Sequence, residues 1–382
     1  MKKAGIITIY QNNRNYGGLL QAYALQKVIQ AFDFESEILN YTQNQASYRF
    51  SRMRNLGLKR TFEVAKNKLK TRMQFRKNPE LGRNIAIRNQ YLHDFEMNIP
   101  HTEPVHDDGI KAVASNYDVL VCGSDQIWNP GLWSPVMFLD IQGFEGRRFS
   151  YAASIGRNQL TEKEKAYISE HAKGLDAISV REKSAENLVQ KLVQKKVETV
   201  LDPTFLLERK DWEKEAKKPE GVPEQFVFSF FLGENADVKK AVFDQFSTRL
   251  PIVTIPHLQT GYKAEDEKYS TVQLYDVGPR EWIWLILNAE YIFTDSFHGT
   301  AFSVNLNRIF FSFPKGAKGD KQSINSRLLD LLTACGIEDR FISDPSMLNE
   351  QMQKTIDWGK VNNYLEQERT RAMTYLQRAL ND

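Results

Sequence analysis

Short apolar segments rich in β-branched residues alternate with helix-like segments along most of this chain, and this alternation restricts the fold more than any other feature. GIITI (5–9) precedes the helix-like LLQAYALQKVIQAF (19–32), and SEILNY (36–41) follows as the next strand. Apolar strands separated by amphipathic helices are typical of parallel sheets that helices cover on both faces. Further strand-like segments span 117–123, 147–156, 177–182, 197–207, 226–233, 251–256, 291–295 and 308–314.

A polar stretch containing proline and glycine, KEAKKPEGVPEQ (214–225), divides these segments into two series. The length of 382 residues suits two domains. We therefore predict an α/β fold with two Rossmann-like domains facing a cleft, over residues 1–215 and 226–345. Helices over residues 346–382 are expected to pack back on the N-terminal domain.

Basic residues gather in a segment of about residues 48–90, which interrupts the alternation. Its moderate helical character predicts an insertion in the N-terminal domain. A solvated helical surface explains this charge. An electropositive lip over an anionic ligand explains it too, as does contact with an anionic membrane surface. The sequence leaves these alternatives open.

Composition narrows the classes of function. A formal net charge of +3 over 382 residues gives no reason to expect a nucleic-acid partner, and no apolar run has the length of a membrane helix. Cys122 and Cys335 lie far apart, as expected for a reduced protein of the cytoplasm. The sequence has no phosphate-loop or metal-binding motif, so we expect no metal and no cofactor. It leaves the oligomeric state open.

Ligands of parallel α/β sheets bind beyond the carboxyl ends of the strands, so the loops at those ends carry the candidate site. After the first strand, Asn15, Gly17 and Gly18 precede a helix. The N–H groups of that helix end could bind an anionic substrate, and the glycines would let it approach the backbone. A capped polar turn explains the same residues equally well.

CGSDQIWNP (122–130) follows another apolar strand. Gly123 and Ser124 could donate hydrogen bonds to a substrate. Asp125 could orient or deprotonate a sugar hydroxyl, although a turn aspartate needs no ligand. Trp128 is interpreted either as a core residue or as a platform for a sugar ring.

SVRE (179–182) places Arg181 at the end of a strand. A guanidinium in this position could bind a carboxylate or a phosphate through two hydrogen bonds. The alternative is a structural ion pair with Glu182 or Asp202.

TDSFHGT (294–300) is the most informative loop. Gly299 permits a tight turn from strand to helix, between the polar residues Ser296 and Thr300. His298 would lie near the helix N-terminus with its ring toward the cleft, where a histidine can exchange protons near neutral pH. A structural histidine in a capping turn is the alternative, and the ligand-type residues of the other loops favour the functional interpretation.

Six motifs occur in order along the chain: NYGGLLQAYAL, VCGSDQIWNP, SYAASIG, ISVREK, VLDPTFLL and TDSFHGTAFS. Together, over about residues 5–340, they resemble the polysaccharide pyruvyl transferase family. The resemblance implies a GT-B-like fold. It also implies transfer of a pyruvyl group from phosphoenolpyruvate to sugar hydroxyls of a cell-surface glycan, which forms a ketal and releases phosphate.

The same resemblance implies roles for residues and partners. His298 is the expected catalytic acid/base and Arg181 the expected donor-binding residue. Asp125 is a second catalytic candidate, which comes from the residues themselves and not from the resemblance. Phosphoenolpyruvate is the implied donor substrate. A glycan or a lipid-linked oligosaccharide is the implied acceptor, which allows contact with the inner face of the membrane.

One position departs from the family pattern. Members often carry an arginine two residues before the motif histidine, as R-L-H-G, whereas this chain has Ser296. Lys315, Lys318 and Arg327 are the candidates to supply the missing charge to the substrate. The alternative functions are a GT-B-type nucleotide-sugar glycosyltransferase and a family member with altered chemistry.

Overall fold

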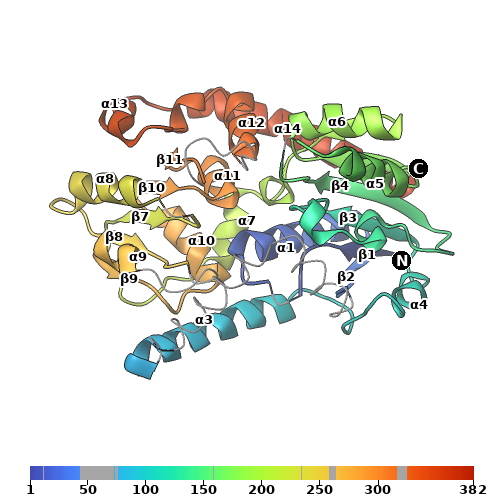
Figure 1. Cartoon of the computed structure of the whole chain (residues 1–382), viewed down its shortest axis with the longest axis horizontal. Coiled ribbons are helices and arrows are strands. Elements are labelled where there is room, and N and C mark those ends of the chain that lie inside the picture. Colours follow the sequence, from blue (N-terminus) through green and yellow to red (C-terminus); the bar gives the residue numbers. More distant parts are fainter. Residues whose placement is uncertain are drawn as a thin grey trace. The chain divides into compact units, whose positions relative to one another are not determined.

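The computed structural model describes residues 1–11, 13–43, 73, 76–157, 159–233, 235–257, 264–315 and 325–382. The chain divides into two compact units (Figure 1). Unit 1 comprises Met1–Asn55, Phe95–Leu207 and Tyr364–Asp382, and unit 2 comprises Leu56–Asp94 and Glu208–Asn363. Each unit is described by itself.

Unit 1 is built on a six-stranded parallel sheet. The strands are β1 (Lys2–Ile7), β2 (Phe34–Ile38), β3 (Val119–Gly123), β4 (Arg147–Ala153), β5 (Ala177–Val180) and β6 (Val197–Thr199). Their order is β2-β1-β3-β4-β5-β6, and each neighbouring pair is parallel. From β1 the chain therefore adds β2 at one edge of the sheet, and from β3 it adds β4, β5 and β6 toward the other edge.

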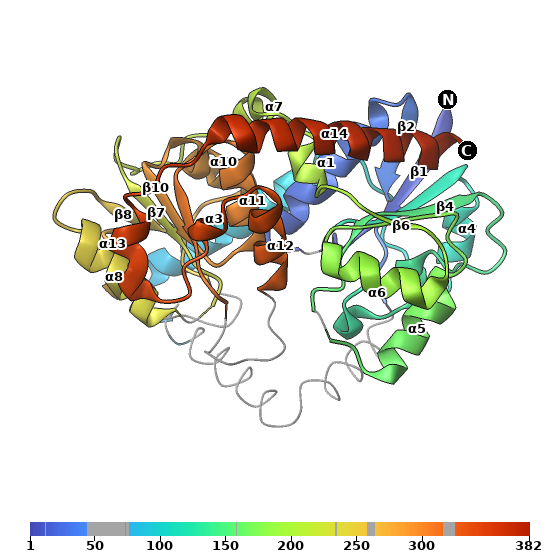
Figure 2. The same ribbon diagram turned by 90° about the horizontal axis from the view of Figure 1, so that it is seen from above.

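Helices follow these strands, as the alternation in sequence predicts. In Figures 1 and 2, α5 (Glu162–Ala172) and α6 (Lys183–Val193) lie side by side. Thr161 and Glu164 form a capping box that starts α5, which explains why the helix begins there. The other helical elements of this part are α1 (Tyr16–Gln30), α4 (Ile110–Ala114), η1 (Pro130–Leu132), η2 (Pro135–Phe138) and η3 (Pro203–Phe205).

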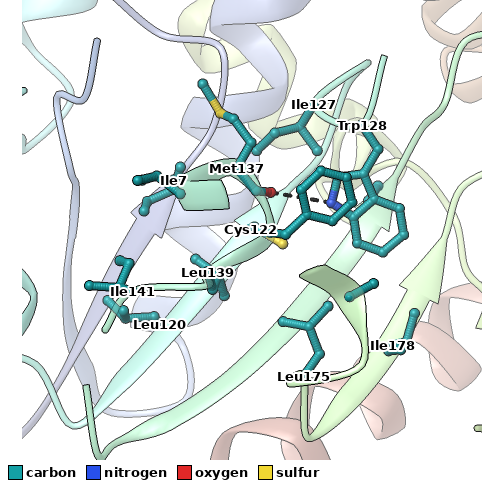
Figure 3. Packing of buried hydrophobic residues seen from close by; sticks show 14 of the residues in the cluster. Ile7, Leu120, Cys122, Ile127, Trp128, Met137, Leu139, Ile141, Leu175 and Ile178 are labelled. Atoms are coloured by element: carbon teal, nitrogen blue, oxygen red, sulfur yellow. Dashed lines mark hydrogen bonds between the residues drawn. The ribbon is translucent and has the colours of Figure 1, made fainter. Parts of the chain in front are cut away.

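Trp128 lies in the core of unit 1 (Figure 3). Its side chain is 0% exposed, its Nε1–H donates to the carbonyl of Met137 at 3.2 Å, and its ring stacks on Phe138 at 5.2 Å. Cys122 belongs to the same cluster. Of the two interpretations of Trp128, the structure supports the core residue, because no face of the indole is left for a sugar.

Unit 2 is built on a five-stranded parallel sheet. The strands are β7 (Val227–Phe230), β8 (Ile252–Thr254), β9 (Val272–Gln273), β10 (Tyr291–Thr294) and β11 (Phe310–Ser312). Their order is β11-β10-β7-β8-β9, which is the Rossmann order when it is read from β9. The helices are α7 (Arg209–Glu215), α8 (Ala236–Phe246), α9 (Ala264–Lys268), α10 (Pro279–Asn288), α11 (Phe297–Asn305), α12 (Ser326–Ala334), η4 (Glu338–Arg340), η5 (Pro345–Met347) and α13 (Leu348–Gln351).

Most of the basic 48–90 segment lies outside the described residues. Its last residues, 79–90, form the first part of α3 (Pro79–Met97). In unit 2, Arg88 of this helix is buried and donates to the carbonyls of Pro256 at 3.0 Å and Leu274 at 2.8 Å. This arginine therefore fixes α3 to the loops that follow β8 and β9.

The division between the units differs from the predicted boundary at residue 215. The middle segment of unit 1 ends at Leu207, so α7 belongs to unit 2. The physical reason is Trp212, which is fully buried and packs edge-on against Phe302 of α11 at 4.8 Å. At the other end, α14 (Trp358–Asn381) contributes its residues from Tyr364 on to unit 1.

Within unit 1, the buried Tyr375 of α14 donates from its hydroxyl to the carbonyl of Ser150 in β4 at 2.8 Å. Tyr375→Phe should lower the free energy of unfolding of unit 1 by about 1 kcal/mol, because this buried hydrogen bond is lost. Urea denaturation measures the change. Gln377→Ala, at an exposed position of the same helix, should change it by less than about 0.5 kcal/mol. Equal effects of both variants would show that the hydroxyl contributes nothing.

Candidate active site

In each unit, the strand order reverses at one place, and the loops on either side of that place carry most of the predicted site residues. The reversal lies between β1 and β3 in unit 1, and between β7 and β10 in unit 2. Such switch points are where open α/β sheets bind ligands. The predicted residues of unit 1 are Asn15, Gly17, Gly18, Gly123, Ser124, Asp125 and Arg181, and those of unit 2 are Ser296, His298, Gly299, Thr300, Lys315 and Arg327. Lys318 lies outside the described residues.

The first loop of unit 1 ends in a capped helix. Asn15 is the N-cap of α1 and its side chain accepts from the N–H of Gly17 at 3.1 Å. Gln21, on the next turn, donates to the carbonyl of Gly18 at 2.9 Å and accepts from the N–H of Ser124 at 3.0 Å. Gln21 therefore connects the loop after β1 to the loop after β3, a link that no sequence pattern indicated.

Gly123 at the end of β3 has a conformation that only glycine adopts readily. Its φ is +127°, and a Cβ placed there would lie 2.0 Å from the carbonyl oxygen of Tyr151. The absence of a side chain is thus needed for close packing of β3 on β4, independently of any ligand.

Arg181 lies at the centre of a buried ion cluster. Its Nη1 is 2.8 Å from Asp202 Oδ2, its Nε is 3.3 Å from Glu182 Oε1, and its Nη2 is 3.7 Å from Asp125 Oδ1. The hydroxyl of Ser124 also donates to Asp202, at 3.0 Å. The parallel sheet thus brings together residues from the ends of β3, β5 and β6.

The electrostatics of this cluster fix the charge of the arginine. Burial alone would lower the pKa of Arg181, but Glu182, Asp202 and Asp125 outweigh it and raise that pKa. The structural ion pair that the sequence offered as the alternative is therefore present. A contact of Arg181 with the donor, and the catalytic role of Asp125, stay predictions.

In unit 2, the turn from β10 into α11 is closed by its own side chains. Ser296 is the N-cap of α11 and accepts from the N–H of Gly299 at 3.3 Å, while its own N–H donates to Thr294 Oγ1 at 3.0 Å. A Cβ on Gly299 would lie 2.6 Å from Thr294 Oγ1. Thr300 contacts the hydroxyl of Ser312 at 2.6 Å, which holds the helix against β11.

His298 is the second residue of α11 and is 5% exposed. Its ring packs edge-on against Phe297 at 5.3 Å, and the guanidinium of Arg327 lies over the same phenylalanine at 5.6 Å. Lys315 follows β11, and its charge acts to lower the pKa of Asp295, three residues before His298. Of the three cations proposed to replace the family arginine, Lys315 and Arg327 are therefore described on the same unit as His298.

Asp295 is a residue of this site that the sequence analysis did not select. Its carboxylate accepts from the N–H groups of Leu232 at 2.6 Å and Gly233 at 2.7 Å, and from Asn235 Nδ2 at 2.9 Å. Burial raises the pKa of Asp295, while these backbone donors and Lys315 act in the opposite direction. Asp295 therefore joins the loop after β7 to the TDSFHG turn at the switch point.

Asp295→Asn tests this link, because the amide group cannot accept from all three donors. We expect hydrogen exchange at the amides of Leu232 and Gly233 to become about tenfold faster, since one oxygen is replaced by an N–H₂ donor. Exchange measured by mass spectrometry or NMR reports it. Asp237→Asn, at an exposed position of α8, is the matched control and should leave both rates unchanged. Unchanged rates in Asp295→Asn would refute the link.

Two searches of the described residues complete the description of the site. No group of three or more His, Cys, Asp or Glu side chains in that part of the chain is arranged to hold a metal ion. In the same residues, no helix combines the length and the apolar character that crossing a membrane requires.

Solved structures share the fold along almost their whole length. UDP-GlcNAc 2-epimerase from Neisseria meningitidis, bound to UDP-GlcNAc, has a TM-score of 0.52 at 8% identity and covers 100% of this chain and 99% of its own. The Methanocaldococcus jannaschii UDP-GlcNAc 2-epimerase has a TM-score of 0.50 at 11% identity, with coverage of 98% and 100%. These similarities, with the two parallel sheets, confirm the predicted class: α/β, with two Rossmann-like units, GT-B-like.

Residues 15–314 match the family described as polysaccharide pyruvyl transferase. The chain belongs to this family, as its motifs indicated. No curated protein matches it in sequence.

Proposed function

We propose that this protein transfers a pyruvyl group from phosphoenolpyruvate to two hydroxyls of a sugar in a cell-surface glycan. The observation that supports this most is the position of His298. It lies in the first turn of α11 at the β7–β10 switch point, on the unit that also carries Lys315 and Arg327. Membership of the family supports the same reaction.

The reaction needs one proton delivered to carbon. Protonation of the methylene carbon of phosphoenolpyruvate makes the neighbouring carbon electrophilic, and a sugar hydroxyl adds there. The C–O bond to phosphate then breaks, and a second hydroxyl adds to complete the ketal. Of the two hydroxyl protons, one balances the proton given to carbon and the other leaves with phosphate. We assign the delivery of the first proton to His298.

Charge complementarity supports binding of the donor on unit 2. Phosphoenolpyruvate is small and strongly anionic, and it needs cations or N–H donors rather than an apolar wall. The first turn of α11, with Lys315 and Arg327, supplies both kinds of group. In unit 1, Asp125 is the candidate to orient an acceptor hydroxyl, and Arg181 holds it as a charged neighbour at 3.7 Å. The acceptor is a glycan or a lipid-linked oligosaccharide, met in the cytoplasm.

His298→Gln should lower turnover by about 10²–10⁴-fold, because the proton donor is lost while the shape of the side chain is largely kept. The assay follows phosphate release from phosphoenolpyruvate with a panel of glycans, together with the mass gain on the glycan. His93→Gln, at an exposed position of α3, is the matched control and should keep full turnover. Near-normal turnover in a folded His298→Gln protein would show that His298 does not deliver the proton. Turnover of a nucleotide sugar instead of phosphoenolpyruvate would favour a glycosyltransferase.

Arg327→Met tests the replacement of the family arginine. The variant should bind phosphoenolpyruvate about tenfold more weakly by calorimetry, because a charged hydrogen-bond donor is lost. Arg249→Met is the matched control, since Arg249 also lies over a phenylalanine, Phe246, at 5.3 Å but at an exposed position after the end of α8. If the wild type and Arg327→Met bind phosphoenolpyruvate with equal affinity, other residues bind this anion.

A further inference from the structure

Unit 1 carries a cavity that none of the predicted site residues lines. Its volume is about 610 Å³, which lies within the range of small-molecule sites. It is formed by residues 107–111 at the start of α4 and by residues 133–136 and 140–142 around η2, with Gln43 at one side. All of these residues belong to unit 1.

One wall of the cavity is an aromatic ring held in a fixed orientation. Trp133 lines the cavity and is partly exposed. Its indole stacks on Tyr167 at 4.4 Å with an interplanar angle of 2°, and Tyr167 is in turn in contact with His171 at 4.2 Å. Because Tyr167 covers one face of the indole, the part of the ring that lines the cavity is its other face or its edge. Such a rigid, flat apolar surface suits the C–H face of a sugar ring.

The polar groups of the cavity are mainly hydrogen-bond acceptors in fixed positions. Asp107 accepts from the hydroxyl of Tyr41, which also contacts Ser134 Oγ at 2.7 Å. Asp140 Oδ2 lies 2.7 Å from His171 Nδ1. Carboxylates that their neighbours hold in place are pre-organised to accept from the hydroxyls of a ligand.

The residues that line this cavity differ in charge from the cations that we propose to bind the donor in unit 2. Among the described residues that line the cavity, three are acidic, Asp107, Asp108 and Asp140, and one is basic, Lys111. This excess of negative charge disfavours phosphoenolpyruvate. The apolar floor, which is formed by Ile110, Val136 and Ile141, disfavours a ligand that is charged throughout.

We propose that this cavity binds a neutral pyranose ring, with Trp133 against its apolar face and the carboxylates and Gln142 on its hydroxyls. The ring belongs to the acceptor glycan of the reaction proposed above, and to that extent the inference rests on the proposed function. Trp128, five residues earlier, was interpreted from the sequence either as a core residue or as a sugar platform, and in the structure it is a core residue.

The test is binding of methyl glycosides of glucose, galactose, mannose and N-acetylglucosamine to the full chain, by saturation-transfer NMR with titration to about 50 mM. At least one glycoside should bind saturably with a Kd of about 1–10 mM. Trp133→Ala should weaken it about tenfold. Gln142→Ala, at an exposed position, should weaken it about threefold. The matched control is Trp284→Ala, a partly exposed tryptophan of unit 2, which should bind like the wild type.

Each other outcome overturns the inference. If none of the four glycosides binds the wild type saturably, the cavity is not a sugar site. The same conclusion follows if the wild type, Trp133→Ala and Gln142→Ala bind the glycoside with equal affinity. Tetralysine is the probe for the competing ligand class: if it binds in place of the glycosides and Trp133→Ala weakens it, the cavity takes a cationic peptide.

The experiment separates this inference from the proposed reaction. His298→Gln should retain glycoside binding, since His298 is not among the described residues that line the cavity. Phosphate release from phosphoenolpyruvate without glycoside binding would support the proposed reaction and refute the cavity as a sugar-binding site. Glycoside binding without any turnover would leave a carbohydrate site on a protein of different chemistry.

Discussion

Parallel pairing of strands is the constraint on which the rest of both units depends. It directs all the carboxyl ends of a sheet to one edge, so loops that are distant in sequence meet there. Ser124 and Asp202, separated by 78 positions, share a hydrogen bond in unit 1. In unit 2, Leu232 and Asp295 are separated by 63 positions and are joined in the same way. At the switch points, the backbone N–H groups of two diverging loops need acceptors, and buried side chains provide them.

The two edges satisfy buried charge in different ways. In unit 1, one guanidinium serves three carboxylates, so its charge is balanced from within the protein. In unit 2, a single carboxylate is held by neutral N–H donors, with Lys315 as a nearby cation. Since removing an ion from water is costly unless it is paired, a paired arginine gains little from a further anion. This difference supports our proposal that an anionic donor binds at the edge of unit 2.

The sequence predicted what periodicity and turn residues encode. Apolar strands followed by helices gave the parallel α/β class, and the glycine after His298 gave the strand-to-helix turn. It did not predict that α7 belongs to unit 2, because the partner of Trp212 is a phenylalanine far along the chain. It missed Asp295 because the partners of that residue are mostly backbone N–H groups, which leave no pattern in side chains. It missed β9 because two residues carry no periodicity.

Ser296 shows what the departure from the family pattern does to the site. Its hydroxyl accepts the N–H of Gly299 and so completes the first turn of α11. An arginine at this position cannot do so, because its side chain has no hydrogen-bond acceptor. In a chain with arginine there, the N–H of the glycine needs another acceptor, and a bound anion can serve. Here the N–H of Gly299 has an acceptor without a ligand. This agrees with our proposal that the residues after β11 supply positive charge to the donor.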